Sequence, residues 1–177
     1  MMQGYHIRLA TATDVPVVAK LYDEIHTAEE AGEQTIGWIR GVYPTAATAE
    51  AALVRGDLFV LEADEILGAA IINQIQVDAY KGAAWAYDAP TDKVCVLHTL
   101  VISPRAGKMG CGRAFVQFYE DYAREHGCAE LRMDTNARNT RARAMYAKLG
   151  YREIGVVPTV FNGIPGVDLV LLEKHLS

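Results

Sequence analysis

The sequence predicts a single α/β domain over residues 1–177. The chain has 177 residues, 51% of them hydrophobic, which is enough to bury one sizeable core and matches one domain of ordinary size. Segments with the two-residue period of strands alternate with segments that have the 3.6-residue period of helices. No repeat, low-complexity tract or linker divides the sequence.

The first elements expected are a strand, two helices and a pair of strands. Residues 5–10 alternate apolar and polar side chains and indicate a strand. Residues 11–31 indicate a helix with Thr13 as candidate N-cap. A short helix at 45–56 ends at a glycine, and two strands at 57–74 are joined by a turn.

The later elements follow an irregular polar stretch at 76–92. The β-branched run 93–103 predicts a strand that Pro104 ends, and residues 111–127 predict a helix closed by a glycine. The remaining elements expected are a strand at 129–135, a helix at 139–150, and a hairpin whose strands, 151–161 and 167–174, flank the turn 162–166.

Charge is distributed unevenly along the chain. The net charge is −5, yet residues 101–148 carry nine Lys and Arg against five Asp and Glu, an excess of +4 that leaves −9 elsewhere. An acidic protein without a basic and aromatic stripe is a poor nucleic-acid binder, whereas a local positive field suits a small phosphate-bearing cofactor.

Several other classes of protein are not expected. No run approaches the roughly 18 apolar residues of a membrane span, and the N-terminus lacks the apolar region of a signal peptide, so we expect a cytoplasmic protein. Cys95, Cys111 and Cys128 are odd in number and have no metal-ligand spacing, which predicts thiols and no metal site.

The stretch SPRAGKMGCGRAF, residues 103–115, places three glycines between an expected strand and an expected helix. Such a loop exposes backbone N–H groups that bind phosphate oxygens, although a plain tight turn would also fit. A P-loop is excluded because Met109 stands where Ser or Thr is needed. The dinucleotide motif fails because Phe115 occupies its third glycine position.

Two motifs resemble one family. LVISPRAGKMGCGRAF, residues 100–115, resembles the acyl-CoA loop of the GNAT N-acetyltransferases, Val-x-Pro followed by Arg/Gln-x-x-Gly-x-Gly/Ala. NTRARAMYAKLGYREIG, residues 139–155, is similar to the second signature of that family. The resemblance departs at Gly107, where the family has Arg or Gln, and Arg105 or Lys108 is the expected substitute.

The resemblance implies a mixed, mostly antiparallel sheet of about seven strands with about four helices, splayed between the fourth and fifth strands. It implies that the pantetheine arm of acetyl-CoA pairs with the backbone of the fourth strand like an added strand, at Leu100, Val101 and Ile102. The other residues that the resemblance assigns to acetyl-CoA are Gly107, Lys108, Met109, Gly110, Cys111, Gly112, Arg113 and Asn139.

The resemblance also implies a reaction, direct acetyl transfer to an amine in a ternary complex. It makes Tyr146 the general acid for the departing thiolate; without the motif, Tyr146 would be expected to pack in the core. The base is His98, Asp134 or water. Strict strand alternation would place Val94, Val96, His98 and Leu100 on one face, and Asp134 matches a substrate-side carboxylate of some relatives.

The acceptor is not identified by either motif. Aromatic residues outside the motifs are candidates for its binding wall, and they are Trp38, Tyr43, Tyr80, Trp85 and Tyr87. The expected acceptor is a small-molecule amine, with a protein N-terminus or lysine as the alternative. A non-catalytic acyl-CoA-binding or sensing module is the other alternative, and the sequence is compatible with a homodimer.

Overall fold

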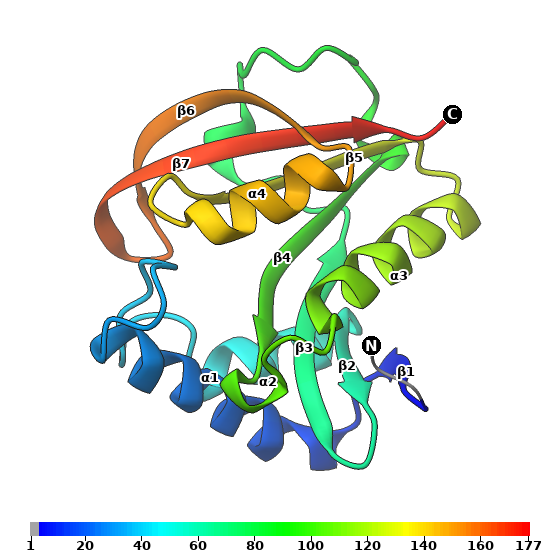
Figure 1. Cartoon of the computed structure of the whole chain (residues 1–177). Helices are drawn as coiled ribbons and strands as arrows, with labels where there is room; N and C mark the ends of the chain where they lie inside the picture. The colour runs from blue at the N-terminus through cyan, green and yellow to red at the C-terminus, as the bar shows by residue number, and fades with distance from the viewer. Residues whose placement is uncertain (1–3) are drawn as a thin grey trace.

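The computed structural model describes residues 4–177 and contains one seven-stranded sheet in the order β1-β2-β3-β4-β5-β7-β6 (Figure 1). Neighbouring strands are antiparallel except β4 and β5, which are parallel. The strands are β1 (His6–Leu9), β2 (Leu58–Glu62), β3 (Ile66–Asn73), β4 (Val94–Ile102), β5 (Glu130–Asn136), β6 (Arg152–Phe161) and β7 (Ile164–His175). The α-helices are α1 (Val15–Glu30), α2 (Ala46–Arg55), α3 (Cys111–Glu125) and α4 (Thr140–Lys148). The predicted order of elements is confirmed.

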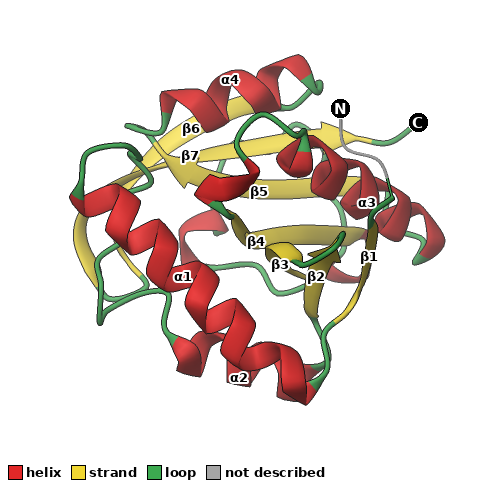
Figure 2. Ribbon diagram, turned by 60° about the horizontal axis from the view of Figure 1, so that its bottom comes forward, coloured by secondary structure: helices red, strands yellow, loops and turns green. Residues whose placement is uncertain are grey.

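The two pairs of helices pack in different hydrophobic clusters. The apolar faces of α1 and α2 pack on β2 and β3. Those of α3 and α4 pack in a second cluster with side chains of β4, β5 and β7. Figure 2 shows α1 and α2 running together, apart from α3 and α4. A third cluster joins β7 and the start of β4 to residues of the irregular segment 76–92.

Two predicted boundaries are wrong. Thr13 does not cap a helix: the N–H of Thr11 donates to Asp14 Oδ2 (2.7 Å) at a short 3₁₀ turn, and α1 begins at Val15. The β6–β7 turn is shorter than expected, because Asn162 and Gly163 both adopt positive φ, 52° and 81°, as a two-residue hairpin turn requires. The strand β7 therefore starts at Ile164.

The strands β4 and β5 part halfway along. They pair only from Val94 to Leu97, after which β5 continues alongside β7 and β4 alongside β3. A bulge interrupts the β3–β4 ladder at this point, and Thr99 within it has φ 48°.

Because of the bulge, the side chains of β4 do not alternate between the two faces of the sheet in the way that the sequence predicts. Val94 and Val96 pack in the cluster with segment 76–92, but Leu100 packs in the cluster of α3 and α4. The predicted common face is therefore wrong at Leu100, because one extra residue in a strand moves all later side chains to the opposite face.

Candidate active site

A cleft of about 500 Å³ opens where β4 and β5 part. Its walls come from β4, the loop before α3, the end of β5, the start of α4, the segment 33–43 and the β6–β7 hairpin. All but two of the predicted site residues line it: His98, Leu100, Ile102, Gly107, Lys108, Gly110, Cys111, Gly112, Arg113, Asp134, Asn139 and Tyr146.

The two predicted residues outside the lining are Val101 and Met109. The side chain of Val101 is fully buried in the cluster of α1 and α2. Met109 is 37% exposed and lies outside the cleft.

The glycine loop leads directly into the N-terminus of α3. Gly107 and Gly110 have φ of 38° and 82°, a left-handed region that favours glycine, and Gly110 is the N-cap of the helix. The N–H groups of Gly112 and Arg113 lie in the first turn, where helix geometry supplies no carbonyl partner. Together with the positive end of the helix dipole they form an anion-binding end.

Positive side chains surround this anion-binding end. Lys108 and Arg113, both predicted, line the cleft, and so does Arg141 in the first turn of α4, which the sequence analysis missed. The signal for Arg141 was its place two residues after the helix cap Asn139. Arg105 pairs with Glu24 (2.9 Å) and Glu65 and does not line the cleft, whereas Lys108, the other expected substitute, does.

The backbone of β4 beyond Leu97 faces the gap. The N–H of Ser103 donates to the carbonyl of Leu67 on β3 (2.8 Å). Because backbone groups alternate in direction along a strand, those of Leu100 and Ile102 point away from β3 and towards the cleft. An extended ligand arm could pair with them as an added strand.

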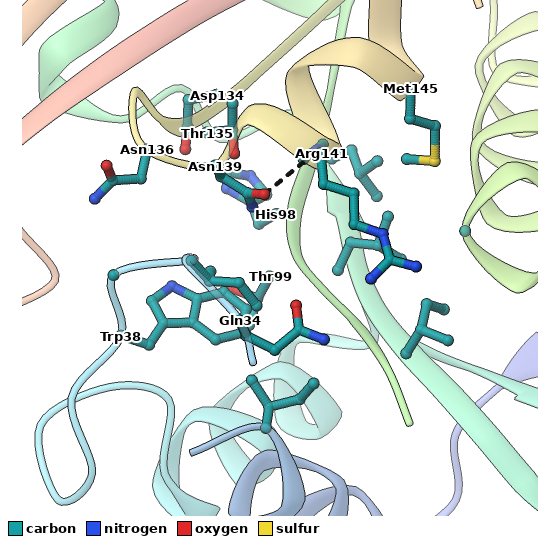
Figure 3. Close-up of a pocket in the computed structure, with 18 of the residues that line it drawn as sticks. Gln34, Trp38, His98, Thr99, Asp134, Thr135, Asn136, Asn139, Arg141 and Met145 are labelled. Atoms are coloured by element: carbon teal, nitrogen blue, oxygen red, sulfur yellow. Dashed lines mark hydrogen bonds between the residues drawn. The ribbon is translucent and has the colours of Figure 1, made fainter. Parts of the chain in front are cut away.

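Tyr146 lies on α4 with 6% of its surface exposed, and its ring packs edge-on against Tyr151 (6.0 Å between centroids). Burial raises the pKa of Tyr146 well above its ordinary value, so the hydroxyl keeps its proton at neutral pH. At the start of this helix, Asn139 Oδ1 accepts the N–H of Ala142 (3.2 Å) and caps α4 (Figure 3).

Asp134, at the end of β5, accepts a hydrogen bond from the hydroxyl of Tyr80 at Oδ2 (2.6 Å). Burial raises the pKa of Asp134 from 3.8 to about 6, and the Tyr80 bond opposes this rise. The group therefore titrates near the pH at which a general base is most effective.

His98 is held by a chain of polar groups. Its Nε2 lies 2.8 Å from Asn73 Oδ1, and Asn73 Nδ2 donates to Asp57 (3.0 Å), so the amide oxygen faces the ring and Nε2 carries the proton. Burial lowers the pKa of His98 to about 4. The ring is neutral at pH 7 and a weaker base than Asp134.

The candidate acid and the candidate bases approach the gap from opposite faces of the sheet. Tyr146 belongs to the cluster of α3 and α4. Tyr80, the partner of Asp134, belongs to the cluster formed with segment 76–92, as does Val96, two residues before His98. The two faces can thus serve two substrates that meet between the strands.

Only part of the predicted aromatic wall lines the cleft. Trp38 and Tyr43 do. Tyr80 is buried, Trp85 packs on Tyr80 and under Arg132, and Tyr87 stacks on His175 at 4.3 Å. The lining residues that the sequence did not indicate on this side include Gln34, Thr99, Thr135, Asn136, Phe161 and Asn162.

The segment 33–43 closes this side of the cleft. A Cβ at Gly37 would overlap the amide of Asn136, and a Cβ at Gly163 of the hairpin turn would lie 3.3 Å from Val42. The segment therefore contacts both the end of β5 and the β6–β7 turn, as Figure 1 shows beside the hairpin. Glu29 Oε1 anchors it to α1 by accepting the N–H of Gly37 (3.0 Å).

Asp134→Asn is expected to stabilise the protein above pH 6. A carboxyl whose pKa is raised in the folded state binds more protons there than in the unfolded chain, so the folded state loses stability as pH rises from 3.8 to about 6. The full cost is up to about 3 kcal/mol, and Asn avoids it while still accepting from Tyr80. The free energy of unfolding of Asp134→Asn should exceed that of wild type at pH 8 but not at pH 3. Equal values for the two proteins at pH 8 would contradict the raised pKa of Asp134.

Within residues 4–177 no group of His, Cys, Asp and Glu side chains is arranged to hold a metal ion. In the same part of the chain, no helix is long and apolar enough to cross a membrane.

Residues 18–151 match the model of the acetyltransferase (GNAT) family. No curated protein matches the chain. A GNAT family acetyltransferase from Streptococcus agalactiae has a similar structure, with TM-score 0.80 and 23% identity over 100% of this chain and 98% of that one. The yncA protein of Salmonella typhimurium, solved with its cofactor acetyl-CoA, has TM-score 0.67 and 18% identity over 99% and 95%. The ribosomal-protein-S18-alanine N-acetyltransferase of Escherichia coli has TM-score 0.68 and 17% identity over 98% and 94%.

Proposed function

The chain belongs to the GNAT acetyltransferase family, and from that premise we propose that it acts as one domain that transfers acetyl from acetyl-CoA to a small-molecule primary amine. The observation that carries this proposal is that Tyr146 and Asp134 both line the cleft where β4 and β5 part and approach it from opposite faces of the sheet. When bound, acetyl-CoA supplies the acetyl group as an activated thioester.

The residues present fit acetyl-CoA. The N–H groups at the start of α3, with Lys108, Arg113 and Arg141, would hold the phosphates. The backbone of Leu100 and Ile102 would pair with the pantetheine arm. This arrangement supports a thioester held at the point where the two strands part.

The protons can be assigned to the chain's own residues. The amine nitrogen bonds to the acetyl carbon as the carbon–sulfur bond breaks, and the ammonium gives up two protons, one to sulfur and one to solvent. Asp134 would accept the first proton that leaves the ammonium, which is the one that passes to solvent. Tyr146 would donate its proton to the departing sulfur and be restored by the second proton from nitrogen.

The closed acceptor side favours a small molecule over a protein N-terminus or lysine. A protein acceptor needs room for its chain to leave the site, but segment 33–43 contacts both Asn136 and the β6–β7 turn. The structurally similar Escherichia coli protein is a ribosomal-protein-S18-alanine N-acetyltransferase, which keeps the protein acceptor as the second candidate.

Thiol release from acetyl-CoA, measured with a panel of small amines and with alanine-initiated peptides, tests the proposal. We expect turnover with amines and little with peptides. Faster turnover of peptides would favour the protein acceptor. CoA that raises the melting temperature without thiol release from any acceptor would indicate a non-catalytic binding module.

The pH profile of turnover should identify the base. We expect activity to rise through about pH 6 in wild type, because Asp134 acts only when ionised. Asp134→Asn should lose most activity together with this acidic limb, whereas His98→Gln should keep the limb. The same limb in Asp134→Asn would exclude Asp134 as the base, and its loss in His98→Gln alone would assign the base to His98.

A further inference from the structure

The charged side chains that line the cleft are divided between its two sides. The cations Lys108, Arg113 and Arg141 come from the loop before α3 and from the first turns of α3 and α4. The carboxylate of Asp134 comes from the end of β5. Among the described lining residues, none contributed by segment 33–43, the end of β5 or the β6–β7 hairpin is a lysine or arginine.

The acceptor side therefore has one carboxylate and no cation in its lining. Its other polar side chains are neutral at pH 7, and they are Gln34, Trp38, Tyr43, His98, Thr99, Thr135, Asn136 and Asn162. A guanidinium nitrogen of Arg138 lies 3.3 Å from the position of a Cβ at Gly37, but Arg138 is exposed and does not line the cleft.

An aromatic ring lies across the cleft from this carboxylate. Figure 3 shows Trp38 on its loop, facing the end of β5 that carries Asp134 and Thr135. The ring is half-buried and packs edge-on against Tyr43 (6.1 Å between centroids, 79° between planes). The hydroxyl of Tyr43 is in turn hydrogen-bonded to Thr99 in the bulge of β4, which fixes the position of the wall.

We propose that the acceptor is an amine with a flat apolar or aromatic body and no carboxylate or phosphate group. This inference rests on the proposed function. The ammonium would bind Oδ1 of Asp134, because Oδ2 is held by Tyr80, and the body would lie against Trp38. An acidic group on the acceptor would be buried beside Asp134 without a cation to neutralise it, which is strongly unfavourable.

The test compares matched acceptors in wild type, Trp38→Ala and Trp38→Phe. The probes are 2-phenylethylamine, its carboxylated counterpart phenylalanine, and propylamine, which lacks a ring. We expect kcat/KM for 2-phenylethylamine to exceed those of the other two by at least about tenfold. Trp38→Ala should reduce the value for 2-phenylethylamine far more than for propylamine, and Trp38→Phe should retain most of it. Arg138→Gln is the matched control, expected to leave these ratios unchanged.

The outcomes separate this inference from the proposed function. Equal or better use of phenylalanine, or a change in its use with Arg138→Gln, would overturn the exclusion of acidic acceptors. Equal use of propylamine, or equal losses for both amines in Trp38→Ala, would overturn the role of the aromatic wall. If no probe releases thiol, the proposed function fails. Calorimetry of the same probes with the CoA-saturated protein then still tests the preference for an aromatic amine without a carboxylate. Tighter binding of phenylalanine than of 2-phenylethylamine would refute that preference.

Discussion

Tyr146→Phe should lower kcat by about a hundredfold and leave the affinity for CoA almost unchanged. General acid assistance is worth about 10²- to 10⁴-fold, and the lower end is expected here because a thiolate is a tolerable leaving group near neutral pH. Tyr146 lines the cleft, and its hydroxyl keeps its proton because burial raises its pKa. Phe preserves the packing against Tyr151, so the loss of stability should be about 1 kcal/mol or less.

Steady-state kinetics and calorimetry with CoA measure the two quantities separately. Tyr122→Phe is the matched control, because Tyr122 stacks on His126 and does not line the cleft. A kcat of Tyr146→Phe within twofold of wild type would remove Tyr146 from the chemistry and leave it a packing role on α4.

Gly110→Asp should abolish most binding of CoA while the protein stays folded. Nothing lies within 4 Å of a Cβ at this position, so the side chain fits, and Asp and Asn are the residues that best tolerate a φ of 82°. The new carboxylate would occupy the N-terminus of α3 and repel the phosphates. A repulsion of about 2 kcal/mol or more corresponds to a loss of affinity of at least about thirtyfold.

Gly110→Asn is the control that separates charge from shape. It places a side chain of the same size at the same position without the charge, and it should weaken binding only a few-fold. Calorimetry with CoA checks both variants. Similar losses for Asn and Asp would mean that close backbone approach, not charge, governs the loop, and unchanged affinity in both would place CoA elsewhere.

The parts of the site that depend on local sequence could be predicted. The glycine loop requires particular residues at fixed spacing, because its backbone must adopt positive φ, as Gly107 and Gly110 do. The order of strands and helices follows from local periodicity, and it also holds.

Contacts between residues far apart in sequence could not be predicted. Arg105 looks suited to phosphate from its neighbours in the loop, yet its partners Glu24 and Glu65 are brought to it by the fold. Tyr80 looks suited to an acceptor wall, but it is buried and donates to Asp134, 54 residues away. No local pattern encodes either pairing, since each depends on which surfaces the fold brings together.

The bulge at Thr99 makes the cleft depend on the length of the chain. Deleting Thr99 would restore a regular ladder in which His98 still faces Ile71 and Val101 still faces Ala69, and β4 would lose the bend and added twist that the bulge gives it where it parts from β5. No substitution at Thr99 can produce this change, because a substitution alters a side chain and leaves the count of residues intact. For protein engineering, this stretch of the strand should tolerate replacement far better than shortening.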